Sequence, residues 1–220
     1  MSVTLLFLLG VGAIIAWWLS QQGLATKPWL EEGAPADLAG AGAPSLPAAK
    51  LGLGVLLAVA GSLFALFISA YHMRMHMGDW SAPPVPRLLW LNTGVLVASS
   101  AALQWSLVAA RRERIDETRT GLLAGGSLAL AFLAGQLLAW RQLVAAGYFL
   151  AANPANSFFY LVTAVHGLHV LGGLVALGVT TTRAWRHDEA GKVRLSVDLC
   201  ALYWHFLLVV WLALFVLLLS

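Results

Sequence analysis

Charged side chains are scarce in this chain of 220 residues, of which Asp, Glu, Lys and Arg together make up 10%. A soluble protein carries about 25% charged residues and about 45–50% apolar ones. Here 60% of the residues are hydrophobic, so there is too little charge to cover the surface of a soluble domain. The composition therefore predicts an integral membrane protein.

Cysteine is almost absent as well. The single Cys200 lies in an apolar run, which excludes a disulfide scaffold and a zinc site built from several cysteines. The formal net charge is +3, but no basic run is interleaved with aromatic residues, so we expect no nucleic-acid partner. The sequence also lacks the phosphate loop GxxxxGK and the metalloprotease motif HExxH.

What the chain does contain is six apolar stretches, nearly free of charge and long enough to span a membrane. They are residues 3–19, 51–71, 88–110, 121–140, 158–180 and 197–219. Only helices suit stretches of this length, because the strands of a membrane barrel are shorter and alternate in polarity. We expect an all-α membrane protein with six transmembrane helices.

These stretches divide the chain into three parts. Residues 1–19 form an N-terminal transmembrane helix, which we expect to be retained because no basic residue precedes its apolar run. Residues 20–50 form a linker in which proline and glycine disfavour a continuous helix. Residues 51–220 form a core of five helices with short connections.

The basic residues predict the orientation of the chain in the membrane. Ten of the thirteen Lys and Arg residues lie in the first, third and fifth connections, and the others are Arg74, Arg87 and Arg141. Lys and Arg accumulate on the cytoplasmic side of membrane proteins. We therefore expect the linker 20–50 to be cytoplasmic and both termini to lie on the outer, periplasmic side of a bacterial-type inner membrane.

The fifth stretch carries the most polar side chains inside a span. Tyr160, Thr163, His166, His169 and Gly173 recur at spacings of three and four residues, which places them on one face of the helix. Because polar groups are costly against lipid, this face is predicted to point into the bundle.

Three interpretations are open for the intramembrane histidines, which include His205 in the last stretch. His166 and His205 could ligate a metal or haem from facing helices, although no carboxylate lies among them to complete a metal site. A proton relay would use a carboxylate, and Asp198 is the only one inside a span. Alternatively, the histidines hydrogen-bond between helices and fix the packing, as the lone amides Gln104 and Gln136 also could.

A second pair of histidines follows the second stretch. His72 and His76 flank Arg74, and all three lie at the end of the apolar run. We interpret this segment as a solvated helix end, with surface metal binding as the alternative.

Several segments resemble subunit III of the haem-copper oxidases. FFYLVTAVHGLHVLGG at 158–173 closely resembles a signature of that family, and YWHFLLVVW at 203–211 resembles the motif of its final helix. Further family segments occur in the same order, namely LNT at 91–93, SS at 99–100, LQW at 103–105, GQ at 135–136 and WR at 140–141. The resemblance covers about residues 51–219. Three acidic residues common in the family are absent, near Ala60, at Leu208 and at Gln142.

The resemblance implies a V-shaped bundle with phospholipid in the cleft between the N-terminal helix portion and the five-helix block. It implies no haem, no copper and no catalytic residue in this chain, so the histidines serve packing. The expected hydrogen-bonding and packing network consists of His166, His169, His205, Gln136, Tyr160 and Gly173. The candidates for contact with lipid or other subunits are Tyr71, Asn92, Gln104, Trp140, Arg141, Trp204 and Trp211.

The implied function is that of a non-catalytic subunit III of a respiratory terminal oxidase, a cytochrome c oxidase that couples aerobic electron transport to proton translocation. Haem and copper are then expected in partner subunits. Oxidase subunit I is the main expected contact, with subunit II, small subunits or a respiratory supercomplex as further partners. The alternatives are an accessory subunit of a quinol oxidase or a nitric oxide reductase and, from another class, a membrane cytochrome that binds haem b.

Overall fold

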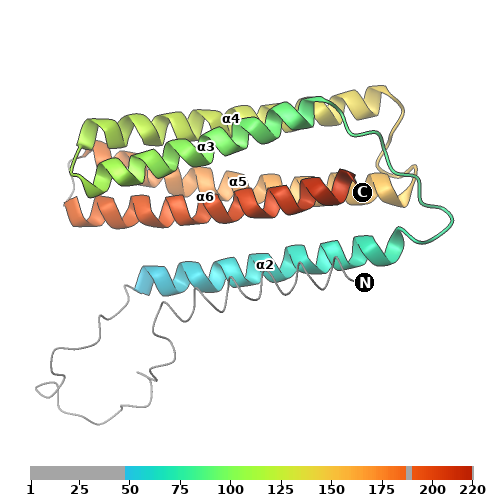
Figure 1. Cartoon of the computed structure of the whole chain (residues 1–220), viewed down its shortest axis with the longest axis horizontal. Helices are drawn as coiled ribbons and strands as arrows, with labels where there is room; N and C mark the ends of the chain where they lie inside the picture. The colour runs from blue at the N-terminus through green and yellow to red at the C-terminus, as the bar shows by residue number, and fades with distance from the viewer. Residues whose placement is uncertain (1–47, 187–189, 220) are drawn as a thin grey trace, which may run out of the picture. The chain divides into compact units, whose positions relative to one another are not determined.

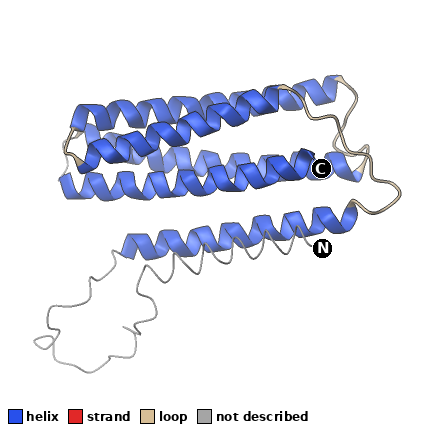
Figure 2. Ribbon diagram, in the orientation of Figure 1, coloured by secondary structure: helices blue, strands red, loops and turns tan. Residues whose placement is uncertain are grey.

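The computed structural model describes residues 48–186 and 190–219, and all regular structure within them is helical (Figure 2). The helices are α2 (Ala48–Arg74), α3 (Leu88–Arg111), α4 (Ile115–Ala145), α5 (Pro154–Trp185) and α6 (Ala190–Leu219). The predicted N-terminal helix 3–19 and nearly all of the predicted linker 20–50 lie outside the described residues.

The chain divides into two compact units, with the boundary between Ala65 and Leu66. The described part of the first unit is the beginning of α2, an apolar helical segment with exposed side chains such as Val55 and Val59. The second unit contains the end of α2 and the helices α3 to α6.

Within the described ranges, five helices are long and apolar enough to cross a membrane. Their outer surfaces carry large apolar side chains, for example Leu137, Leu168 and Val175. Exposed side chains of this kind suit contact with lipid rather than with water. The prediction of an all-α membrane protein is confirmed.

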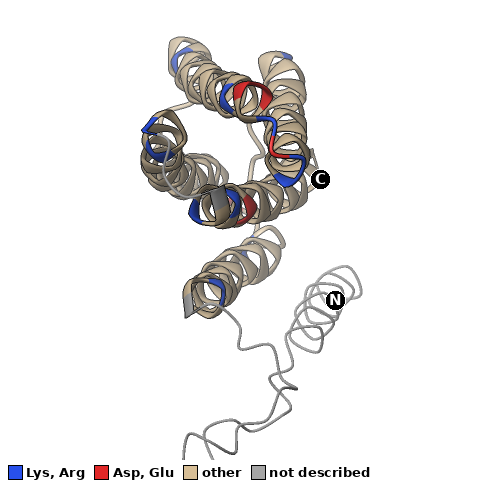
Figure 3. Cartoon of the chain, turned by 90° about the vertical axis from the view of Figure 1, so that its left-hand side faces the viewer, with Lys and Arg blue, Asp and Glu red and all other residues tan. Residues whose placement is uncertain are grey.

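The helices α3 to α6 form a ring in chain order (Figures 1 and 3). α3 packs against α4, α4 against α5, α5 against α6, and α6 closes the ring against α3. The short connections 112–114 and 146–153 make successive helices antiparallel, as in other up-and-down bundles.

Three helices of the bundle begin before the apolar stretches predicted for them. α4 begins at Ile115, and its first turn carries Asp116 and Glu117, whose negative charges stabilise a helix N-terminus. At the start of α5, the side chain of Asn153 accepts a hydrogen bond from the amide of Ala155 at 2.6 Å. Pro154 then occupies the first helical turn, where its missing amide hydrogen costs nothing. A search for apolar stretches alone does not detect these first turns, because their residues are polar.

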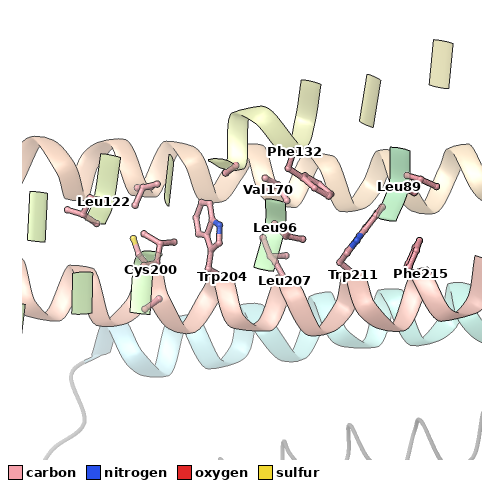
Figure 4. Packing of buried hydrophobic residues seen from close by; sticks show 14 of the residues in the cluster. Leu89, Leu96, Leu122, Phe132, Val170, Cys200, Trp204, Leu207, Trp211 and Phe215 are labelled. Atoms are coloured by element: carbon pink, nitrogen blue, oxygen red, sulfur yellow. The ribbon is translucent and has the colours of Figure 1, made fainter. Parts of the chain in front are cut away.

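The core of the bundle is one cluster of buried side chains from all four helices. Trp204 and Trp211 project from α6 into its interior (Figure 4). Trp211 meets Phe132 of α4 edge to face, with ring centroids 5.0 Å apart, an arrangement that aromatic quadrupoles favour.

Charged residues gather at the end of the bundle that faces the viewer in Figure 3. At the end where α3 leads into α4, Arg111 donates a hydrogen bond to Asp198 of α6 at 3.2 Å. Arg119 of α4 donates to the carbonyl of Ala184 in α5 at 3.1 Å. These contacts bring the basic residues of the third and fifth connections to one end of the bundle.

Candidate functional site: polar contacts inside the bundle

Hydrogen bonds join α3 and α6, which run antiparallel, at several points along the contact between them; this contact is called the α3–α6 seam. The indole of Trp211 donates to the hydroxyl of Thr93 at 3.0 Å, and the indole of Trp204 donates to the hydroxyl of Ser99 at 3.1 Å. The two tryptophans lie seven residues apart, which is two helical turns. These hydrogen bonds fix the register of α3 against α6.

His205 bonds to two side chains of α3 in the same seam. Its Nδ1 lies 2.5 Å from the hydroxyl of Ser100, and its Nε2 lies 2.9 Å from Oε1 of Gln104. A neutral imidazole that donates from Nε2 and accepts at Nδ1 satisfies both contacts. The geometry therefore suits an uncharged histidine that holds two helices together.

Trp204 is connected to all three other helices of the ring. It contacts α3 and α5 directly and reaches α4 through the hydrogen bond of Ser99. Its side chain is fully buried. Ser99, which accepts its indole hydrogen bond, donates in turn to the carbonyl of Gly125 in α4 at 2.8 Å. On the other side, the ring of Trp204 lies against Gly173 of α5.

His166 is fully buried among aromatic rings. Its ring centroid lies 5.8 Å from that of Phe132 in α4, edge to face. The centroid of Trp211 in α6 lies 5.1 Å from it. His166 therefore occupies the interior between three helices.

Asn92 and Gln136 form a polar contact between α3 and α4. The side-chain amide of Asn92 donates to the carbonyl of Phe132 at 3.0 Å and to Oε1 of Gln136 at 3.2 Å. Gly135 lies directly beneath Asn92, so that a side chain there would collide with it. The Nε2 of Gln136 is buried and has no hydrogen-bond partner among the described residues.

A further group lies between α4 and α5. The indole of Trp140 donates to the hydroxyl of Thr163 at 3.1 Å, and its ring lies 5.8 Å from that of Tyr160. The phenol of Tyr160 donates to the carbonyl of Tyr148 at 2.9 Å. The neighbouring Arg141 is exposed.

The remaining predicted residues lie in two other places. His169 is half-buried and bonds through Nδ1 to the carbonyl of Val165 in its own helix at 2.8 Å, while its own carbonyl accepts from the phenol of Tyr203 in α6 at 2.9 Å. Tyr71 of α2 is buried, and its ring lies 5.9 Å from that of Phe158 in α5.

The structure thus distributes the predicted residues over several interhelical contacts. His205 and Gln136 both bond to α3, through Gln104 and Asn92, whereas Tyr160 bonds to Tyr148 in the connection between α4 and α5. Three residues of α3 that bond to side chains of α6 were not predicted as site residues, namely Thr93, Ser99 and Ser100. Their spacing of six to seven residues matches the spacing of Trp204 and Trp211, and that periodicity is the signal that could have found them.

Two adjacent glycines allow a matched test of the α5–α6 contact. A Cβ atom on Gly173 would lie 2.7 Å from the ring of Trp204 and 2.8 Å from that of Tyr203, whereas one on Gly172 would meet nothing within 4 Å. We expect Gly173→Ala to lower the free energy of unfolding by about 1 kcal/mol through overpacking, and Gly172→Ala not to lower it. Unfolding of the detergent-solubilised chain followed by circular dichroism measures both, and equal stabilities would contradict the contact.

The polar side chains of this interior join neighbouring helices. Among residues 48–186 and 190–219, no group of three or more His, Cys, Asp or Glu side chains is placed to hold a metal ion. The buried polar groups described above bond mainly to other groups of the bundle. Interhelical hydrogen bonds in a membrane contribute about 0.6 kcal/mol each, so their joint effect is to fix one arrangement of the helices.

Comparison with known proteins decides the family. The family model for cytochrome c oxidase subunit III matches residues 52–220. This chain belongs to the cytochrome c oxidase subunit III family.

Individual subunits III resemble it over most of their length. The probable cytochrome c oxidase subunit 3 of Mycobacterium tuberculosis (strain ATCC 25618 / H37Rv) is 34% identical over 156 residues, which are 70% of this chain and 76% of that protein. The cytochrome c oxidase subunit 3 of Thermostichus vulcanus is 31% identical over 180 residues, 76% of this chain and 85% of that protein. That of Yarrowia lipolytica is 31% identical over 181 residues, 76% of this chain and 66% of that protein.

The chain is therefore subunit III of a respiratory terminal oxidase, and is itself non-catalytic. It is a multi-pass membrane protein of the cytochrome c oxidase complex, so other oxidase subunits are its partners. The function predicted from the sequence motifs is confirmed.

Proposed function

We propose that this subunit III stabilises the catalytic subunit of its oxidase, and that it does so as a preassembled bundle whose outer surface contacts protein and phospholipid. The observation that carries this proposal is the set of contacts around Trp204, which join α6 to α3, α4 and α5. The polar side chains of the interior are used for packing, and the redox centres belong to partner subunits.

Subunit I is the main proposed partner, and α3 offers a feature that supports contact with protein. Gln104 is exposed within the span of α3, next to the half-exposed Trp105. An amide is costly against lipid, so exposed polar groups in a span favour contact with protein. Subunit II, small subunits or a respiratory supercomplex are further proposed contacts.

The arrangement in the membrane is also a proposal. The sequence resemblance supports a V-shaped molecule, with 1–19 and 51–220 separated by the linker 20–50 and phospholipid held in the cleft. The bias of Lys and Arg supports a cytoplasmic linker and periplasmic termini in a bacterial-type inner membrane. The proposed internal network keeps the residues given above, centred on His166, His169 and His205.

The test is His166→Ala in the complete oxidase. The change removes a ring that packs against Phe132 and Trp211, and a loss of about 1–2 kcal/mol in stability lowers protein abundance several-fold. We expect a lower yield of complex, or a shorter lifetime during turnover, with unchanged haem and copper per catalytic subunit. Leu168→Ala, at a position 64% exposed on the same helix, is the control and should leave the yield unchanged.

Two outcomes would overturn this proposal. Loss of haem or copper in His166→Ala would show that the histidine acts at a metal centre. Unchanged yield and lifetime would show that the bundle interior does not support the complex. Mass spectrometry of the co-purified subunits identifies the partners and should recover a copper-containing subunit.

A further inference from the structure

The turn that follows α2 carries a set of side chains that the stabilising role does not use. Residues 72–77 read HMRMHM and contain three of the four methionines of the chain and two of its six histidines. Methionine is commonly buried in proteins, yet Met73 is 75% exposed and Met77 is 58% exposed. Core packing therefore does not explain the cluster.

Helical geometry, continued for two residues past the end of α2, puts four of these side chains on one side of the chain. α2 ends at Arg74, and the amide of Met75 still donates to the carbonyl of Tyr71 at 2.9 Å, which is α-helical pairing. At 3.6 residues per turn, an arc of about 160° holds, in order, Met75, His72, His76 and Met73. Two imidazoles at i and i+4, a spacing that brings both rings to one metal ion, are thus flanked by two thioethers.

Arg74 lies on the opposite side of the helix, and its charge is compensated. Its guanidinium donates to both carboxylate oxygens of Asp79, at 2.6 and 2.5 Å. The hydrogen bond from Arg74 holds the pKa of Asp79 below its usual value, so the carboxylate stays charged at neutral pH. The ion pair offsets the one positive charge within the segment 72–77.

His72 is already oriented as a ligand. Its Nδ1 lies 2.9 Å from the carbonyl of Ile68, and a carbonyl only accepts, so Nδ1 carries the hydrogen. The lone pair is then on Nε2, the nitrogen that does not take part in the bond to Ile68. A backbone carbonyl that accepts from the other ring nitrogen fixes the tautomer of many metal-binding histidines.

The turn after the cluster is folded back and ordered by its own contacts. The amide of Met77 donates to the carbonyl of Arg74 at 3.1 Å, and that of Trp80 donates to the carbonyl of Met77 at 3.1 Å. The ring of Trp80 meets the ring of the buried Tyr71 edge to face at 4.8 Å. The three-residue turn from Arg74 to Met77 puts Met77 on the Arg74 side of the chain, so it is not counted among the donors.

We propose that His72, His76, Met73 and Met75 form a surface binding site for Cu(I). Thioether and imidazole ligands without a carboxylate are the donor set that Cu(I) prefers, whereas Ca²⁺ and Mg²⁺ take oxygen ligands and Zn²⁺ sites rely on thiolate, imidazole and carboxylate. The site is separate from the bundle interior and does not depend on the stabilising role proposed above.

The test is a competition for Cu(I) between the full-length chain in detergent and the chromophoric chelator bicinchoninate, under anaerobic conditions with ascorbate. We expect one Cu(I) to be withdrawn per chain. The double variant Met73→Leu/Met75→Leu, which keeps the apolar volume, should weaken Cu(I) binding by at least about tenfold. A loss of about tenfold already follows when only a group that orients a metal ligand is changed. Met77→Leu is the matched control, with the same substitution four residues from Met73, and should bind as the unaltered chain does.

X-ray absorption of the bound copper and one further variant complete the test. We expect both sulfur and nitrogen scatterers, with the sulfur lost in the double variant. Failure to withdraw Cu(I), or an equal loss in Met77→Leu, would overturn the proposal. So would binding of undiminished affinity in the double variant, which would indicate a two-histidine site that does not use the thioethers. Loss of binding in Cys200→Ser would identify the single thiol as the ligand and would also refute it.

Discussion

Truncation of Trp204 to alanine is expected to lower the free energy of unfolding of the bundle by about 3–5 kcal/mol, the cost of removing a large aromatic side chain from a packed interior. The side chain is fully buried and lies between α3 and α5. In a membrane the loss arises from packing rather than from the hydrophobic effect, because lipid is as apolar as the core. The change also removes the indole that donates a hydrogen bond to Ser99.

A second variant separates the two contributions. Trp204→Phe keeps most of the ring but loses the hydrogen bond to Ser99, which is worth about 0.6 kcal/mol between membrane helices. Unfolding of the full-length chain by titration with a denaturing detergent, followed by circular dichroism, measures both variants. Equal losses in the two would show that the hydrogen bond dominates, and a loss below about 1 kcal/mol in Trp204→Ala would show that Trp204 is not a packing centre.

The helices of the described region were predictable from the sequence because a membrane imposes a minimum length on each apolar run. The predicted stretches 88–110 and 158–180 lie within α3 and α5. The extra turns could not be read from hydropathy, since Asn153 and Asp116 stabilise helix starts through hydrogen bonding and charge. The end of α2 likewise extends past Tyr71 to Arg74.

The interior residues were predictable face by face, but their partners were not. Spacings of three and four residues placed Thr163, His166 and Gly173 on one face of α5, and all three are buried. That His205 bonds to Ser100 and Gln104 depends on the register and rotation of α6 against α3. A periodicity within one helix carries no information about either quantity.

Close approach between helices sets that register, and glycines of α4 illustrate how. Gly121 and Gly125 form a GxxxG pair on the face toward α3, a spacing that lets two membrane helices approach closely. Ser99 donates to the carbonyl of Gly125 at 2.8 Å, and Ser106 donates to the carbonyl of Thr118 at 2.9 Å. Both bonds need the backbones of α3 and α4 to be in contact.

Gly121→Ala is therefore expected to be the second most damaging of these substitutions. A Cβ atom there would lie 2.6 Å from Cβ and 2.9 Å from Cα of Ser106. Because the obstruction includes backbone, α3 itself must move, and the cost falls toward the upper end of about 1–3 kcal/mol for overpacking. At Gly125 the obstruction is the side chain of Leu103, which can rotate, so Gly125→Ala should cost less.

The matched control is Gly94→Ala, because a Cβ atom on Gly94 would meet nothing within 4 Å. The same detergent titration should rank the losses as Gly121→Ala, then Gly125→Ala, then Gly94→Ala. A side chain can absorb a collision by changing rotamer, whereas a helix backbone moves only as a unit and takes its hydrogen bonds with it. If all three variants unfolded within about 0.5 kcal/mol of one another, as substitutions at open surface positions do, the close contact of α3 with α4 would not determine the packing of the bundle.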